Sequence, residues 1–296
     1  MAEIIDGKAV AAELRVSIKE EVARLKAAHG KTPGLAVVLV GEDPASTVYV
    51  RNKGKGCEET GMMSFQYNLS ASTSEEELLA LVGELNARAD VNGILVQLPL
   101  PKQINEEKVI NAIDPRKDVD GFHPVNVGKV VIGDPTAFSP CTPYGCQVLI
   151  SRHVKSTKGK HLVIVGRSNI VGKPLANLMV QKNEMANCVV TVCHTAASDI
   201  AHFTRQADIL VVAAGRPNTV TGDMVKEGAV VIDVGVNRIT DPADASKTKL
   251  VGDVNFDEVK EVASAITPVP GGVGPMTITM LLQNTLRAFK LQNSFN

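Results

Sequence analysis

Apolar residues near the amino terminus recur every three or four positions, which places them on one face of a helix: Val10, Leu14, Ile18, Val22 and Leu25. The pattern predicts a helix that Asp6 can cap and that Gly30 ends. Apolar runs predict buried strands at 34–40 and 93–98, and a further strand is expected near 64–69. Helices are predicted between them, so the first half should form a parallel twisted sheet with helices on both faces.

The second half of the chain repeats this alternation. Apolar runs predict four further strands that alternate with helices: 161–165, 188–193, 208–213 and 229–234. Irregular stretches at 114–122 and 139–143 separate the halves, and a helix is expected at 144–153. A chain of 296 residues is longer than most single domains. We therefore expect two α/β domains, with the crossover near residue 142.

A tyrosine and a lysine stand out in the first half. The turn Gly41–Pro44 follows the strand 34–40 and should open a helix that carries Tyr49 and Lys53. Residues four apart lie on one helix face. Open α/β sheets bind ligands at the carboxyl ends of their strands, so this pair could stack a flat substrate and move a proton beside it. The alternative is a solvated pair on an exposed helix.

The stretch Gly166–Gly172 links the strand 161–165 to a helix, as in dinucleotide-binding turns. It lacks the full glycine fingerprint, because Ser168 stands in the place of the second glycine. Later strands end in His194-Thr195, in Gly215 and in Gly235-Val236. Small residues at neighbouring strand ends leave room for a cofactor, so the second half is predicted to bind a nucleotide.

The stretch 267–277 contains three prolines and three glycines in eleven residues, which gives a stiff and shaped backbone. An apolar helix is predicted to follow at about 276–292. The loop can return the chain to the first domain with backbone groups facing a ligand. The alternative is a simple hinge.

Composition narrows the function further. The formal net charge is −1, so no basic field indicates a nucleic-acid partner. No apolar run reaches the roughly eighteen residues of a membrane span. The first seven residues lack the apolar core of a signal peptide, so we expect a cytoplasmic protein. The five cysteines are odd in number and lack the C-x-x-C spacing of zinc knuckles, which favours reduced thiols and no bound metal.

Six stretches, in this order, resemble the bifunctional methylenetetrahydrofolate dehydrogenase/methenyltetrahydrofolate cyclohydrolase family: Tyr49–Lys53, Gln97–Pro101, Lys117–Gly121, Pro140–Pro143, Gly166–Gly172 and Pro270–Thr277. They span nearly the whole chain. Any one of them could arise by chance, whereas six in order are highly specific.

The resemblance implies two α/β domains with a cleft between them, the second a Rossmann-like parallel sheet, and a homodimer. A folate-binding catalytic domain would comprise 1–142, completed by the carboxyl-terminal helix at 275–296, and an NADP-binding domain would comprise 143–274. The enzyme would oxidise 5,10-methylenetetrahydrofolate to 5,10-methenyltetrahydrofolate by hydride transfer to NADP. It would then hydrolyse that product to 10-formyltetrahydrofolate.

The resemblance also implies residue roles. Tyr49 would stack on the aminobenzoyl ring, Lys53 would be the catalytic amine, Gln97 would hydrogen-bond near it, and Asp120 would hold the pterin. Further substrate-binding residues would be Leu98, Pro270, Gly271, Gly272 and Val273. The cofactor-binding residues would be Gly166, Arg167, Ser168, Ile170, His194, Thr195, Gly215 and Val236.

These residue types suit the chemistry. A pterin edge presents neighbouring N–H donors, for which a carboxylate is a natural acceptor. Hydrolysis needs a group that assists water attack, and a lysine whose pKa is lowered by partial burial could serve. A glutamine such as Gln97 can orient that amine without adding a charge that would raise its pKa.

Three alternatives remain at this stage. Many relatives carry a basic residue after the position of His194, whereas this chain reads Thr195-Ala196-Ala197-Ser198. Arg167 is then the only obvious partner for the 2′-phosphate, so NADP is expected and NAD is the main rival. A dehydrogenase without cyclohydrolase activity is a second alternative. A nucleotide-binding module without turnover is a third, and the retention of Tyr49, Lys53, Gln97 and Asp120 together argues against it.

Overall fold

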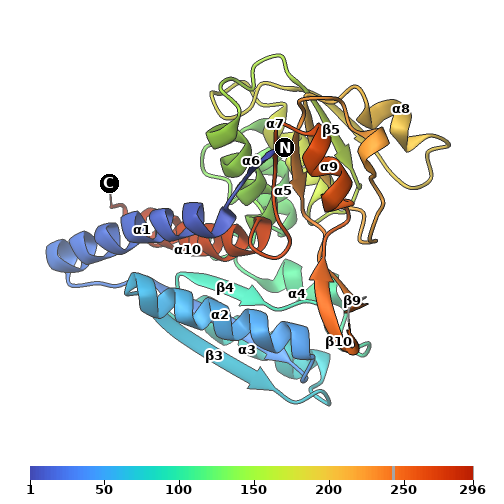
Figure 1. Ribbon diagram of the computed structural model, residues 1–296. Helices are drawn as coiled ribbons and strands as arrows, with labels where there is room; N and C mark the ends of the chain where they lie inside the picture. Colours follow the sequence, from blue (N-terminus) through green and yellow to red (C-terminus); the bar gives the residue numbers. More distant parts are fainter. Residues whose placement is uncertain (242–243, 296) are drawn as a thin grey trace. The chain divides into compact units, whose positions relative to one another are not determined.

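The computed structural model describes residues 1–241 and 244–295, which form two compact units (Figure 1). The first, named here the six-stranded unit, contains 1–11 and 142–277. The second, the three-stranded unit, contains 12–141 and 278–296. No helix of the described residues has the length and apolar character needed to cross a membrane.

The three-stranded unit is a parallel sheet in the order β3-β2-β4. Its strands are β2 (Gly34–Val40), β3 (Met63–Leu69) and β4 (Gly93–Val96). The central strand β2 is buried along its whole length, as its continuous apolar run predicts. Alternate residues of β2, from Ala36 to Val40, share a core cluster with apolar residues of two helices, α3 (Glu75–Ala87) and α4 (Glu106–Ala112).

Capping residues fix the helix starts of this unit. A capping box begins α3, because Ser74 Oγ accepts from Glu77 N at 3.2 Å and Glu77 Oε2 accepts from Ser74 N at 2.8 Å. Asp43 caps α2 (Pro44–Thr60) through a bond of 2.8 Å from Ser46 N. The remaining helices with residues here are α1 (Gly7–His29), α5 (Pro124–Ile132) and α10 (Val273–Asn293). Ile18, Val22 and Leu25 of α1 and Leu281, Leu282 and Leu286 of α10 are buried, whereas Val131 and Ile132 of α5 are exposed.

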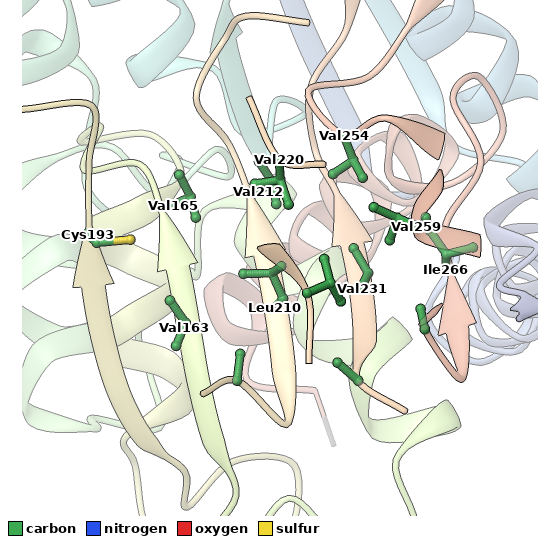
Figure 2. Packing of buried hydrophobic residues seen from close by; sticks show 14 residues of the cluster. Val163, Val165, Cys193, Leu210, Val212, Val220, Val231, Val254, Val259 and Ile266 are labelled. Atoms are coloured by element: carbon green, nitrogen blue, oxygen red, sulfur yellow. The ribbon is translucent and has the colours of Figure 1, made fainter. Parts of the chain in front are cut away.

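The six-stranded unit is an all-parallel sheet in the order β1-β11-β8-β7-β5-β6. The strands are β1 (Glu3–Ile4), β5 (His161–Val165), β6 (Val189–Cys193), β7 (Ile209–Val212), β8 (Val230–Asp233) and β11 (Ala265–Ile266). Figure 2 shows side chains of neighbouring strands meeting on one face, among them Val163, Leu210 and Val231. This buried layer holds the strands in register.

Short helices and a hairpin complete this unit: α6 (Cys141–His153), α7 (Gly172–Met179), α8 (Ile200–Thr204), the 3₁₀ turn η1 (Gly222–Met224), β9 (Asn237–Asp241) with antiparallel β10 (Asp244–Val251), and α9 (Phe256–Val262). The chain runs from β5 to β6 on one side and then returns to β7 on the other side of β5. This reversal is a topological switch point, where doubly wound sheets bind ligands at the carboxyl ends of their strands.

The structure differs from the sequence prediction mainly in short or polar elements. Strands β1 and β11 have two residues each, which is too few to show a period. Because β1 pairs with β11, residues 1–11 belong to the six-stranded unit rather than to the other unit as predicted. The hairpin of β9 and β10 was not predicted because it is polar, and α5 was not predicted because its valines and central glycine are poor helix formers.

Candidate active site and cofactor site

Helix α2 carries the first two residues of the candidate active site. Tyr49 and Lys53 lie one turn apart on it, as the spacing predicts. Tyr49 is half-buried, whereas Lys53 is only 7% exposed. A lysine is almost never so buried unless a partner satisfies it. The alternative of a solvated pair is therefore wrong for Lys53.

The partner of Lys53 is Gln97, which follows strand β4. Gln97 N donates to Val38 O at 2.8 Å and so extends the sheet by one residue. Its side chain accepts a hydrogen bond of 2.7 Å from Lys53 Nζ to Oε1, and its Nε2 donates to Leu98 O at 2.6 Å. The second bond fixes the amide orientation, so that an uncharged oxygen faces the amine.

Asp120 completes a cluster of coupled groups. Burial lowers the pKa of Lys53, and the negative charge of Asp120 opposes that shift. Burial likewise raises the pKa of Asp120, and the positive charge of Lys53 opposes it. Cys141 also interacts with Asp120, and burial raises the pKa of its thiol well above the ordinary value. The structure thus brings Lys53, Gln97 and Asp120 together, and their catalytic and binding roles stay predictions.

The loop that presents Asp120 is held from inside by its neighbours. Lys117 Nζ donates to two backbone carbonyl oxygens, of Leu85 at 3.1 Å and of Arg88 at 2.6 Å. The Asp118 carboxylate accepts from the backbone N–H groups of residues 121 to 123 and from the side-chain amide of Asn126 at 2.8 Å. The motif Lys117–Gly121 therefore combines two structural side chains with one that faces the site.

A hollow opens beside this loop. Apolar side chains form most of its wall, and two carboxylates provide the polar part: Ile94, Leu95, Val96, Leu98, Val109, Ile110, Ile113, Asp118, Asp120 and Phe122. Its volume of about 20 Å³ is room for a single water molecule.

Cys141 is the residue of this site that sequence reasoning missed. Its motif, Pro140–Pro143, is part of the family resemblance, which implies no role for this cysteine. Asn284 of α10 donates to Val119 O at 2.8 Å, to Ser139 O at 2.9 Å and to Cys141 Sγ at 3.8 Å. It thereby ties the Asp120 loop, at Val119, to the segment 139–141. No periodicity could have indicated this, because the contact spans more than 140 positions.

The cofactor site is built on the glycine turn after β5. Gly166 has a φ of +133°, and a Cβ there would lie 2.2 Å from Ala213 O. A Cβ on Gly172 would lie 2.1 Å from Gly166 O, so both ends of the turn require glycine. Ser168 fits the place of the second glycine because its Oγ accepts from Val171 N at 3.1 Å and closes the turn.

Helix α7 begins directly after this turn. Within the described chain no side chain caps its first turn, so the positive end of its dipole is available to an anion. Helix amino termini after such glycine turns bind the pyrophosphate of dinucleotides. The turn and the helix therefore have the local geometry of a dinucleotide site.

The predicted cofactor residues all lie at the carboxyl ends of strands in this sheet, which are named here the cofactor edge. They follow four strands that are neighbours in the order β8-β7-β5-β6. Arg167 and Ile170 are exposed beside the turn, Thr195 is exposed after β6, and Val236 is 52% exposed after β8. His194 Nδ1 accepts from Ala196 N at 3.2 Å, and Gly215 has a φ of +72°. The edge thus offers exposed side chains on a backbone shaped by glycine.

The proline- and glycine-rich loop belongs to the six-stranded unit, in which it precedes and opens α10. Its Gly271 O accepts from Lys8 N at 3.0 Å, and Gly272 N donates to Pro268 O at 2.9 Å. A Cβ on Gly7 would lie 1.9 Å from Gly272 O, so the loop and the start of α1 are in close contact. A substrate-binding role for Pro270–Val273 stays a prediction.

The fold and these sites define a dinucleotide-binding enzyme that carries its buried amine on a second α/β unit. Two family models cover most of the chain: the catalytic domain of tetrahydrofolate dehydrogenase/cyclohydrolase at residues 5–120, and its NAD(P)-binding domain at 140–293. The chain belongs to the tetrahydrofolate dehydrogenase/cyclohydrolase family. The predicted family and enzyme class are confirmed.

Individual relatives agree over nearly the full length. The bifunctional protein FolD of Chlorobium limicola is 60% identical over 292 residues, which is 98% of this chain and 99% of that protein. The crystal structure of the bifunctional FolD enzyme from Campylobacter jejuni is 46% identical with a TM-score of 0.92, over 99% of this chain and all of that one. The Trypanosoma brucei enzyme, solved with NADP and an inhibitor, is 40% identical with a TM-score of 0.92, over 99% and 98% of the two chains. The predicted two-domain α/β fold is confirmed.

Proposed function

We propose that this enzyme oxidises 5,10-methylenetetrahydrofolate with NADP and hydrolyses the resulting methenyl compound to 10-formyltetrahydrofolate, with Lys53 as the proton carrier of the hydrolysis. The observation that carries this proposal is the bond of 2.7 Å from the buried Lys53 Nζ to Gln97 Oε1. Family membership supports both activities, and the site gives each a chemical reason.

The hydrolysis is the step that needs an amine. Water attacks the cationic methenyl carbon and gives up one proton, which Lys53 accepts in its neutral form. The hydroxyl proton then moves to nitrogen 5 of the pterin as the bond from the bridging carbon to that nitrogen breaks. A formyl group is left on nitrogen 10, and one proton is released overall. Burial favours the neutral amine, and Gln97 holds it by an uncharged acceptor.

The dehydrogenase step needs positioning more than acid or base. Departure of a hydride to the nicotinamide leaves a cation that the ring nitrogens stabilise. We assign the pterin edge to the Asp120 carboxylate and the aminobenzoyl ring to the half-buried Tyr49. The charge of the nearby Lys53, which opposes the rise in the pKa of Asp120 caused by burial, supports a carboxylate at this position.

The cofactor is NADP. A relative 40% identical to this chain was solved with that cofactor. Arg167, exposed after the glycine turn, is assigned to the 2′-phosphate, since a guanidinium can bind phosphate with two parallel hydrogen bonds. Thr195 is assigned a supporting hydroxyl. The other predicted cofactor residues, Gly166, Ser168, Ile170, His194, Gly215 and Val236, stay assigned to the dinucleotide.

The protein is expected to be a homodimer in the cytoplasm. Strand β6 is an edge of the six-stranded sheet, and it exposes Val189 at 61% and Val192 at 40%. Exposed apolar residues on an edge strand favour a partner surface. All five cysteines are buried without a disulfide, which suits a reducing compartment. Light scattering after size-exclusion chromatography tests the dimer, and a monomer at micromolar concentration would contradict it.

Two assays test the function. Reduction of NADP and of NAD with methylenetetrahydrofolate should show an NADP preference, and samples analysed at neutral pH without acidification should contain 10-formyltetrahydrofolate. Because the neutral amine is the active form, hydrolysis should accelerate as pH rises through the pKa of Lys53, which burial lowers. A preference for NAD, no formyl product, or a hydrolysis rate that falls with rising pH would contradict the respective part of the proposal.

A further inference from the structure

Two buried aspartates lie beneath the cofactor edge of the six-stranded sheet. Asp233 ends β8 and is 3% exposed, and Asp253 follows β10 and is fully buried. Neither was singled out from the sequence. Charged carboxylates are rarely buried unless hydrogen bonds compensate them.

The Asp253 carboxylate binds the loop after β7. Its Oδ2 accepts from two consecutive backbone groups, Ala214 N at 2.7 Å and Gly215 N at 2.8 Å. Its Oδ1 accepts from Asn237 Nδ2 at 2.8 Å. The backbone at Gly215, which has left-handed geometry, is therefore fixed from below by one carboxylate.

The Asp233 carboxylate binds the loop after β8 and connects it to Asp253. Its Oδ1 accepts from Gly235 N at 3.0 Å and Asp253 N at 2.9 Å, and its Oδ2 accepts from Val254 N at 3.0 Å. Val254 is itself in the core shown in Figure 2. Asp233 thus links the residue before Val236 to a rigid part of the unit.

The neighbouring glycines fit this arrangement closely. A Cβ on Gly235 would lie 2.2 Å from the carboxyl carbon of Asp253, and a Cβ on Gly252 would lie 1.8 Å from Asp233 Oδ2. Side chains at these positions would displace the carboxylates. Burial raises the pKa of Asp233 to about 6, and the charge of Asp253 adds to that rise. The compensation for both carboxylates comes mainly from backbone N–H groups.

We propose that Asp233 and Asp253 are positioning residues of the cofactor site, which hold the Ala214–Gly215 and Gly235–Val236 loops in the shape that receives the dinucleotide. The proposal rests on the assignment of Gly215 and Val236 to the cofactor. Neither aspartate acts on the reacting atoms. Their effect is on cofactor affinity, because a loop that must be ordered at each binding event binds more weakly.

The central test is Asp253→Asn, which keeps the shape but turns a charged acceptor into a neutral one. Calorimetry should show a Kd for NADP about tenfold higher or more, as expected for weakening two charged hydrogen bonds. Hydrolysis of methenyltetrahydrofolate consumes no NADP, so its kcat/KM should stay within about twofold of the wild type. Exchange of the Ala214 and Gly215 amide protons should become faster.

Asn237→Ala is the milder companion, because it removes one bond to Asp253 and one to Gly252 O but leaves the bonds from Asp253 to Ala214 and Gly215 in place. It should raise the Kd for NADP by about twofold to fivefold. Asp257→Asn is the matched control, since this carboxylate is exposed and pairs with Lys260 on the surface. It should leave NADP binding unchanged.

Two results would overturn the proposal. One is unchanged NADP affinity in a folded Asp253→Asn protein. The other is a parallel loss of hydrolysis and NADP binding in both Asp253→Asn and Asn237→Ala, which would indicate a general role in folding. Failure of the wild type to hydrolyse the methenyl substrate would instead contradict the proposed function and leave the binding comparison intact.

Discussion

The Lys53 site and the cofactor edge differ in burial: the first is a buried cluster of ionisable groups, and the second carries exposed side chains. The first is a buried cluster in which Lys53 and Asp120 have pKa values shifted by burial and by each other's charge. The second offers exposed side chains, such as Arg167 and Thr195, on a backbone shaped by glycine and held by buried carboxylates. Proton transfer near neutral pH needs a perturbed group, whereas binding a charged cofactor needs fixed donors that water can still reach.

Lys53→Met is expected to have the largest effect, and to impair the Lys53 site while sparing the cofactor edge. A neutral side chain of similar length keeps the packing but removes the proton carrier, so hydrolysis of methenyltetrahydrofolate should fall by about 10²–10⁴. NADP and folate should still bind, as calorimetry would show. Lys55→Met is the matched control, because this lysine lies on the same helix and is exposed. Near-normal hydrolysis by the Lys53 variant would remove Lys53 from the mechanism.

Arg167→Ala is expected to do the opposite, impairing the use of NADP while sparing hydrolysis. Losing two charge-assisted contacts to the 2′-phosphate should lower kcat/KM for NADP by about thirty- to a hundred-fold and affect NAD far less. Hydrolysis should be unchanged. Arg205→Ala, at another exposed arginine of the same unit, serves as control. If the Arg167 variant keeps its full NADP preference, another residue binds the phosphate.

Asp120→Asn tests the substrate side of the comparison. The amide keeps an acceptor oxygen but loses the charge, which should weaken folate binding by about tenfold. NADP affinity should be almost unchanged, as it should for Asp90→Asn, a surface carboxylate of the same unit. Equal losses of both ligands in Asp120→Asn would point to a folding defect. Equilibrium binding of each ligand alone distinguishes these outcomes.

The sequence predicted the long elements of both units but not the buried aspartates that hold the site loops, which are Asp118, Asp233 and Asp253. Strands such as 34–40 and 161–165 were visible because continuous apolar runs mark buried parallel strands. Lys53 and Gln97 were proposed as partners from the family resemblance, and the structure shows their hydrogen bond. Burial of Lys53 could not be read from the helix pattern, because it depends on a loop 44 positions away.

These aspartates could not be recognised from the sequence, because most of their hydrogen-bond partners are backbone N–H groups. Asp118, Asp233 and Asp253 all follow or flank apolar runs, where an aspartate usually begins a turn. Their function depends on N–H groups from distant loops, and backbone groups have no signature in the sequence. The glycines Gly235 and Gly252 are the sequence feature that reflects this packing, because a side chain at either position would clash with Asp253 or Asp233.

The smallest predicted effect is that of salt, and it depends on the exposure of the cofactor edge. Raising KCl from 0.1 to 1 M shortens the screening length from about 10 Å to about 3 Å. Salt weakens the attraction between Arg167 and the phosphate but leaves their hydrogen bonds, so the Kd for NADP should rise by only about threefold to fivefold. NAD binding and hydrolysis at the buried Lys53 should change less. Arg167→Ala should lose most of the difference in salt response between the two cofactors, which titrations at both salt concentrations would measure. An equal salt response of NADP and NAD in the wild type would contradict the contrast between an exposed cofactor edge and a buried catalytic cluster.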